Sequence, residues 1–195
     1  MKSDRDLIQI VDAAMAEAVR RSGSWIACRR GCYECCMGPF PITQLDAIRL
    51  REGLAELQTV DPERAERIRD RARASVARLH REFPDATISQ ILEIEDAADD
   101  EACPALDPDS GSCDLYAARP ITCRTFGPAI RGAGGPEGHP LGVCELCYRG
   151  ATDEQIADCA VEIDTRCEAE LLEELEESTG RRDETLVAFA LLEAS

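Results

Sequence analysis

Four cysteines lie within nine residues near the start of the chain. They are Cys28, Cys32, Cys35 and Cys36 in the segment CRRGCYECC, with the spacing C-x3-C-x2-C-C. Thiolates are soft, strong metal ligands, and ligands this close in sequence lose little loop-closure entropy when one metal gathers them. The segment therefore predicts a metal site. Because Cys35 and Cys36 are adjacent, their side chains are expected to leave the backbone in different directions and to serve different metals, or different irons of one cluster.

Further thiols come later in the chain. Cys103, Cys113 and Cys123 follow a long cysteine-free interval, with nine residues between neighbours, and Cys144 and Cys147 form a C-x2-C pair. The candidate metal ligands are thus Cys28, Cys32, Cys35, Cys36, Cys103, Cys113, Cys123, Cys144 and Cys147. They suffice for two four-thiolate sites or for one cluster with thiols to spare, and the spacing leaves both arrangements open.

Two other uses of cysteine compete with metal binding. A disulfide framework is disfavoured because the total of 11 cysteines is odd and the opening segment lacks the apolar run of a secretory signal. The other use is core packing, since free cysteine is among the most buried residue types. We expect it for Cys159 and Cys167, which fall on a helical stripe with Ile156, Ile163 and Leu171.

Composition narrows the class of protein. At 195 residues the chain is predicted to form one domain, residues 1–195. Its formal net charge of −17 disfavours a nucleic-acid binder, which gains affinity by neutralising phosphates. No apolar run is long enough to cross a membrane. We therefore expect a cytoplasmic protein with neither nucleic acid nor membrane as a partner.

The spacing of apolar residues predicts a mainly α-helical fold. Helices are expected at 5–21, from Thr43 as a cap, from Pro62 to about Phe83, from 152 to a stop at Gly180, and over 183–193. The pattern does not decide the type of the short element at 87–95. The cysteine-bearing loops, 28–43 and 103–150, are expected to be irregular and organised around the metal, followed by C-terminal helices over 152–193.

Other residues near the cysteines are assigned supporting roles. Thiolates gathered at one site repel each other, and nearby arginines are expected to offset that charge. These arginines are Arg29, Arg30, Arg119, Arg124 and Arg149. Asp107 is interpreted as a turn cap, because a hard carboxylate suits a thiolate site poorly. His139 is a less favoured ligand, and the arginines of residues 62–83 are interpreted as a solvated helix face.

The cysteine blocks resemble the YkgJ-like cysteine-cluster family, also named CxxCxxCC, of proposed zinc- or iron-chelating domains. The resemblance covers residues 28–43 and 103–127 and the Cys147 region. It includes the Cys-Pro-x-Leu-Asp run at Cys103–Asp107, the Gly111-Ser112-Cys113 turn, Tyr116, and Arg119-Pro120-x-x-Cys123-Arg124-x-Phe126. The family implies eight metal-binding cysteines, which correspond here to Cys28, Cys32, Cys35, Cys36, Cys103, Cys113, Cys123 and Cys147. This chain departs from the pattern in the longer Cys28–Cys32 spacing and in a ninth thiol, so the last ligand is open between Cys144 and Cys147.

The sequence thus predicts a metal-binding protein that holds an iron–sulfur cluster or Zn²⁺ for redox chemistry, sensing or metal handling, with a protein as a further partner. The adjacent cysteine pair and the number of thiols tilt the prediction toward iron–sulfur. One alternative is a zinc-stapled module for protein interaction. Another is an iron–sulfur enzyme, since the flagellin lysine N-methylases carry a similar cysteine pattern. Catalysis is not favoured, because this chain lacks a glycine-rich strand-to-helix turn for a nucleotide-like cofactor.

Overall fold

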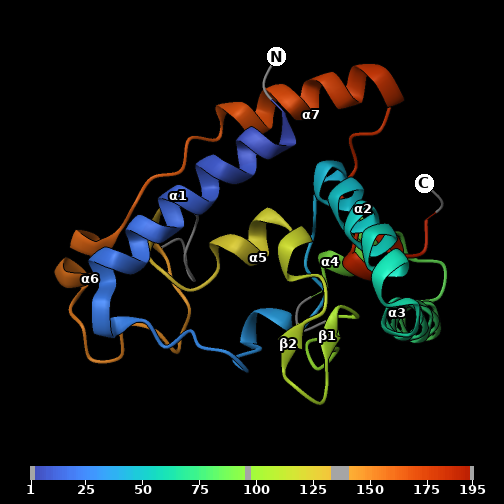
Figure 1. Ribbon diagram of the computed structural model, residues 1–195, viewed down its shortest axis with the longest axis horizontal. Helices are drawn as coiled ribbons and strands as arrows, with labels where there is room; N and C mark the ends of the chain where they lie inside the picture. The colour runs from blue at the N-terminus through green and yellow to red at the C-terminus, as the bar shows by residue number, and fades with distance from the viewer. Residues whose placement is uncertain (1–2, 95–97, 133–140, 194–195) are drawn as a thin grey trace. The chain divides into compact units, whose positions relative to one another are not determined.

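The computed structural model describes residues 3–94, 98–132 and 141–193. Within these ranges the fold is mainly α-helical, as predicted, and the strands form short antiparallel pairs (Figure 1). The chain divides into two compact units. The first unit is built from Met1–Arg29 and Ile121–Glu174, and the second from Arg30–Pro120 and Leu175–Ser195. The prediction of one domain over residues 1–195 stays a prediction.

The first unit contains helices and one short antiparallel pair of strands. Its elements are α1 (Asp4–Ser22), η1 (Gly23–Trp25), α5 (Ile121–Thr125), β3 (Ile130–Arg131), β4 (Leu141–Gly142), α6 (Asp153–Cys159) and most of α7 (Arg166–Thr179). α1 begins at a capping box, in which Ser3 Oγ accepts from the Asp6 amide and the Asp6 carboxylate accepts from the Ser3 amide. α1 then packs against α5 and α6. The helix predicted over 5–21 is thus confirmed.

A chain of hydrogen bonds through Tyr148 ties the core of the first unit to α1. Tyr148 is 4% exposed, and its hydroxyl accepts a bond from the buried Ala129 amide at 2.9 Å. Ser22 uses its single hydroxyl proton on the Ala18 carbonyl at 2.6 Å. The 2.5 Å contact between Tyr148 and Ser22 is therefore donated by the tyrosine. The relay satisfies polar groups that burial would otherwise leave without partners.

The helix predicted from residue 152 to Gly180 is wrong as a single element. Its capping box at Thr152 forms, but α6 ends at Cys159 and α7 begins only at Arg166. In the interval Val161 pairs with Ile130 in an isolated bridge. This pairing joins residues far apart in sequence, so the local apolar period carries no signal of it. Between α6 and α7 the backbone therefore pairs with Ile130 and does not continue the helix.

Cys159 and Cys167 are buried, as predicted for core residues. Cys159 is 7% exposed and Cys167 is 1% exposed. The Cys159 thiol also contacts the Arg21 carbonyl at 3.5 Å. Their burial therefore does not require the continuous helix that the sequence pattern suggested.

The second unit is built around two long helices. Its elements are η2 (Glu34–Cys36), α2 (Gln44–Val60), α3 (Pro62–Glu82), α4 (Ile88–Leu92), β1 (Leu106–Asp107), β2 (Ser112–Cys113), η3 (Tyr116–Ala118) and α8 (Val187–Ala190). Thr43 caps α2 by accepting from the Asp46 amide, and Asp61 caps α3 by accepting from the Arg64 amide. Both starts agree with the prediction.

The core of the second unit lies where α2, α3 and α8 pack together (Figure 1). Its largest members include Ile42, Leu50 and Ile68, each at most 1% exposed. The segment 87–95, which the sequence left undecided, contains α4 with a capping box at Thr87. The helix predicted over 183–193 is shorter than expected, because Thr185 pairs with Ile42 before α8 begins. Among the described residues, no helix is both long enough and apolar enough to span a bilayer.

Replacing Tyr148 with phenylalanine is expected to lower the free energy of unfolding by about 1–3 kcal/mol, because it leaves the buried Ala129 amide without an acceptor. Urea unfolding followed by circular dichroism measures the loss. Tyr116→Phe is the matched control, since Tyr116 is 63% exposed and should change stability by less than about 0.5 kcal/mol. Equal effects of the two substitutions would contradict the buried relay.

Candidate metal centre

The two units divide the predicted metal ligands between them. The first unit contains Cys28, Cys123, Cys144 and Cys147. The second contains Cys32, Cys35, Cys36, Cys103 and Cys113, and none of these five is in a disulfide. Each unit therefore has at least four of the thiols that the sequence singled out.

Backbone pairing brings Cys36 and Cys103 together in the second unit. The Cys103 amide donates to the Cys36 carbonyl at 2.7 Å. Met37 and Ala102, the residues beside them, form an isolated antiparallel bridge. The end of η2 thus lies against the segment that leads into Cys103, although α2, α3 and α4 separate the two in sequence.

A hairpin adds Cys113 to this group. In the β1–β2 pair Cys113 lies opposite Leu106. Asp107 holds the turn, since its carboxylate accepts from the Ser110 hydroxyl at 2.5 Å and from the Ser110 amide at 3.3 Å. Its interpretation as a turn cap is confirmed.

The hairpin turn requires glycine at its tip. Gly111 has a φ of +62°, and an added Cβ there would lie 3.3 Å from the backbone of Gly31. The turn therefore packs on the residue directly before Cys32, and the two cysteine blocks of this unit lie against each other.

Four thiols of the second unit lie close enough to shift one another's pKa. A hydrogen bond donated by the Cys36 thiol lowers the pKa of Cys35 to about 6, helped by the charge of Arg119. The same hydrogen bond, together with burial, raises the pKa of Cys36. Burial raises the pKa of Cys103 to about 12 and also raises that of Cys113. At neutral pH the group therefore holds one thiolate, Cys35, and three protonated thiols.

The thiols of Cys35 and Cys36 lie closer together than the expectation of divergent side chains allows, while their binding to different metals or irons stays a prediction. Both residues lie in η2, a single 3₁₀ turn, and one thiol donates a hydrogen bond to the other. The tight turn overrides the divergence expected of neighbours in an extended chain.

Asp114, which the sequence reasoning missed, fixes the cysteine loops to α3. Its side chain is 3% exposed and accepts from Arg64 Nε and Arg71 Nη2, each at 2.6 Å. Arg71 Nε also donates to the Pro104 carbonyl at 2.7 Å. The same two arginines thus hold the residue after Cys113, and one of them also holds the residue after Cys103.

Arg64 and Arg71 stay 39% and 26% exposed, but the interpretation of the α3 arginines as a solvated face did not include their bonds to Asp114. Arg78 extends the same pattern, since it binds Asp100 and Glu101 at 2.6 Å each, shortly before Cys103. The three arginines are spaced seven residues apart, which places them on one helix face. That spacing was the available signal in the sequence.

Two of the arginines expected to offset thiolate charge have defined partners. Arg119 packs its guanidinium over the Tyr116 ring, 3.6 Å from the centroid. Its charge helps to lower the pKa of Cys35 and partly opposes the rise that burial causes in the pKa of Cys113. Its role is as predicted. Arg124 instead binds the carboxylate of Asp12 at 2.9 and 3.1 Å and thereby joins α5 to α1.

Three cysteines of the first unit, Cys28, Cys144 and Cys147, lie near Gly127. The Cys144 amide donates to the Gly127 carbonyl at 3.2 Å, and the Cys147 amide donates to the Cys144 carbonyl at 2.9 Å. A Cβ on Gly127 would lie 2.7 Å from Cys28 Sγ, and the φ of +117° also calls for glycine. The structure thus places both members of the C-x2-C pair in the same small core, at 6% and 5% exposure.

The donors of both groups suit a thiophilic metal, because thiolate is the preferred ligand of zinc and of iron–sulfur clusters. Across the described residues, no three cysteine, histidine, aspartate or glutamate side chains are positioned to hold a metal ion without moving. Binding would therefore need side-chain adjustment and loss of the thiol protons. His139 lies outside the described residues.

In the metal-free protein, Cys35 is expected to react with iodoacetamide above about pH 6, because its thiolate forms once the pH exceeds its lowered pKa. Cys103 should stay unmodified at neutral pH. Peptide mass spectrometry after brief labelling across the pH range measures both. In Cys36→Ala the donor is gone, so the Cys35 midpoint should rise toward about 8.5. An unchanged midpoint in that variant would exclude the hydrogen bond as the cause.

Asp114→Asn is expected to lower the free energy of unfolding by about 2 kcal/mol, because two arginines lose a charged partner that is almost fully buried. The thiols of Cys103 and Cys113 should also become more reactive toward iodoacetamide. Asp70→Asn is the matched control, since Asp70 pairs with Arg73 at an exposed position of α3 and should cost less than about 0.5 kcal/mol. Similar losses in both variants would refute a special role for Asp114.

One comparison with known proteins gives the family of the chain. A model of the CxxCxxCC family, described as "putative zinc- or iron-chelating domain", matches residues 27–136. The matched segment includes every cysteine of the second unit, and also Cys28 and Cys123, but not Cys144 or Cys147. No curated protein and no solved structure matches the chain. The family description fits Zn²⁺ or an iron–sulfur cluster as the cofactor, and the match spans more than half of the sequence, so the chain belongs to the CxxCxxCC family of metal-chelating domains.

Proposed function

We propose that the protein binds metal at two separate groups of cysteines, one in each unit, and that each group holds an iron–sulfur cluster. The ligands of the second unit would be Cys35, Cys36, Cys103 and Cys113, with Cys32 as the remaining predicted thiol of that unit. The ligands of the first unit would be Cys28, Cys123, Cys144 and Cys147. Redox chemistry, sensing and metal handling are the roles that such groups serve.

The observation that carries the proposal is the convergence of four cysteines of the second unit, which come from η2, from the segment before β1 and from β2. The Cys103 amide donates to the Cys36 carbonyl, the turn before β2 packs on Gly31, and the four thiols lie close enough to shift one another's pKa. A hydrophobic core gains nothing from keeping one of its cysteines ionised, since burial disfavours the charged form. A metal gains directly from such a group, because the thiolate is the ligand and the remaining protons leave on binding.

The surrounding residues would serve such a centre in definite ways. Arg119 offsets negative charge beside Cys35 and Cys113. Asp114, held by Arg64 and Arg71, keeps the segments after Cys103 and Cys113 in place. These contacts orient the ligands and lower the entropy lost on metal binding.

Iron–sulfur is favoured over zinc because of the adjacent pair in η2. Two neighbouring cysteines on one tetrahedral ion close a small, strained ring, whereas the separate irons of a cluster accept neighbouring thiolates. A bound cluster would supply reversible one-electron chemistry; zinc would supply a closed structural site.

The test is the content of iron, zinc and acid-labile sulfide in protein purified without oxygen, with a visible spectrum. Iron and sulfide in similar amounts, with a broad visible absorption, are the expected result. Zinc without sulfide would instead establish a zinc-stapled module. Protein without either metal, even after reconstitution, would overturn the proposal.

Paired variants test the division into two groups. Cys35→Ala with Cys113→Ala, and separately Cys144→Ala with Cys147→Ala, should each lose about half of the bound metal. Cys159→Ala, a buried cysteine outside both groups, should retain all of it. Complete loss of metal from either pair would mean that the thiols serve one shared site.

A further inference from the structure

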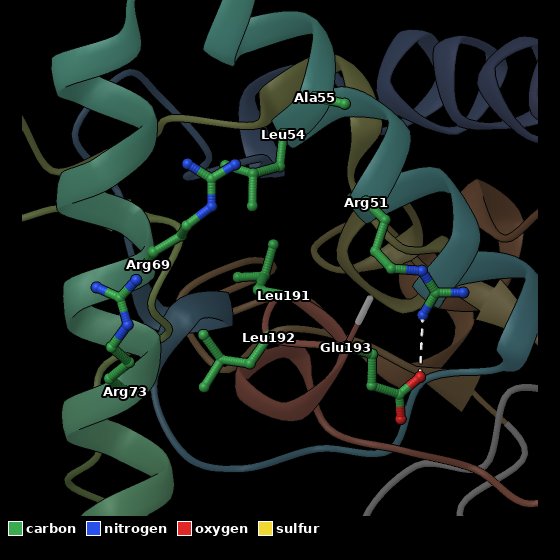
Figure 2. A pocket seen from close by; sticks show the side chains of 8 residues that line it. All are labelled: Arg51, Leu54, Ala55, Arg69, Arg73, Leu191, Leu192 and Glu193. Atoms are coloured by element: carbon green, nitrogen blue, oxygen red, sulfur yellow. Dashed lines mark hydrogen bonds and ion pairs between the residues drawn. The ribbon is translucent and has the colours of Figure 1, made fainter. Parts of the chain in front are cut away.

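A cavity of about 480 Å³ lies in the second unit, away from the cysteines. α2 contributes Arg51 and Leu54 to its wall, α3 contributes Arg69 and Arg73, and the residues after α8 contribute Leu191 and Leu192 (Figure 2). The volume falls in the range of roughly 300–1,000 Å³ that is usual for small-molecule sites. No lining residue belongs to the proposed metal groups, so this site is independent of them.

The lining offers three guanidinium groups beside one carboxylate, that of Glu193. Glu66 and Asp70, just outside the lining, pair with Arg69 and Arg73, so carboxylates already balance the arginine charge. A guanidinium has five N–H donors, and those that its carboxylate partners leave over can bind a second anionic group. The ligand is therefore expected to carry a small anionic group that accepts from these donors.

The three guanidinium groups are held in place and still have donors to offer. Each is fixed through its Nη1 nitrogen. The bonds run from Arg51 to Glu193 at 3.2 Å, from Arg69 to Gln58 and Glu66, and from Arg73 to Glu66 at 2.9 Å and Asp70 at 2.6 Å. Within the described part of the chain, Nε and Nη2 of these three arginines make no hydrogen bond. The Nε–Nη2 edge of a guanidinium presents two parallel N–H groups, which match the two oxygens of a carboxylate.

The rest of the lining is aliphatic. Leu54 and Leu191 are each 4% exposed, while Leu192 is 37% exposed. In Figure 2 the guanidinium of Arg69 reaches toward Leu54, and Leu191 and Leu192 lie between α3 and the Arg51–Glu193 pair. A ligand that fills this space has a charged head beside Arg69 and a hydrocarbon body on the leucines. Covering Leu192 would remove an exposed apolar side chain from water.

From this combination we infer that the cavity binds a small aliphatic carboxylate, with its head group on Arg69 and its chain over Leu191 and Leu192. Octanoate is a suitable probe, because it joins a carboxylate to a short unbranched chain. Isothermal titration of the full-length, metal-loaded protein with octanoate should show saturable binding of one molecule per chain. Octylamine, which has the same chain with a positive head, should bind at least about tenfold more weakly.

Matched variants on α3 test the assigned residue. Arg69→Gln should weaken octanoate binding about tenfold, the loss expected for one charge-assisted hydrogen-bonding group. Arg67→Gln is the control, since Arg67 is exposed on the same helix and does not line the cavity, and its affinity should equal that of the wild type. Circular dichroism of each variant checks that the helices remain folded.

Three results would overturn the inference. One is the absence of saturable octanoate binding to the wild-type protein. Another is equal affinity for octanoate and octylamine, which would reduce the site to a nonspecific apolar surface. The third is equal binding by the wild type and a folded Arg69→Gln variant. An acidic leucine-containing peptide that binds where octanoate does not would assign the cavity to a protein partner instead.

Discussion

The carboxylate of Asp114 holds the thiol-bearing part of the second unit to its helical frame. α2 and α3 bury a continuous apolar core, but the segment from Cys103 to Cys113 consists of a hairpin with strands of two residues each, and its flanks. So short a hairpin has little stability of its own. The pairing of Asp114 with Arg64 and Arg71, and the bond from Arg71 to the Pro104 carbonyl, supply the missing anchorage. Because the Asp114 carboxylate is almost fully buried, leaving it without these partners would be costly, and the loop depends on the contact.

The second physical problem is how several thiols stay together without a metal. Ionised together they would repel one another strongly at such short range. The structure avoids this because the group carries a single charge. The Cys36 thiol keeps its proton and donates a hydrogen bond to the Cys35 thiolate, and burial favours the neutral forms of Cys103 and Cys113. Arg119 then balances the single thiolate. Metal binding would release the protons of the other three, so affinity is expected to rise with pH across the neutral range.

Local signals in the sequence were sufficient to predict where several helices begin. Thr43, Asp61 and Thr152 each cap a helix where a side-chain oxygen was expected to meet a free amide, and Asp107 caps its turn. Most of the expectations that failed depend on partners distant in sequence. Val161 leaves the helical pattern because Ile130 offers it a backbone partner, and Arg64 and Arg71, whose side chains stay 39% and 26% exposed, bind the buried carboxylate of Asp114. The expected divergence of the Cys35 and Cys36 side chains failed for a local reason, since a 3₁₀ turn was not anticipated there.

The division of the chain into two units also changes how its departure from the family pattern is understood. The family match ends at residue 136 and accounts for all five thiols of the second unit, but for only Cys28 and Cys123 in the first. Two thiols are too few for a four-thiolate site. Cys144 and Cys147 would complete the set. Both are buried beside Tyr148, and the Cys144 amide bonds to the carbonyl of Gly127, which lies next to Cys28. In the proposed arrangement the choice between Cys144 and Cys147 as the last ligand disappears, because a second site in the first unit would need both.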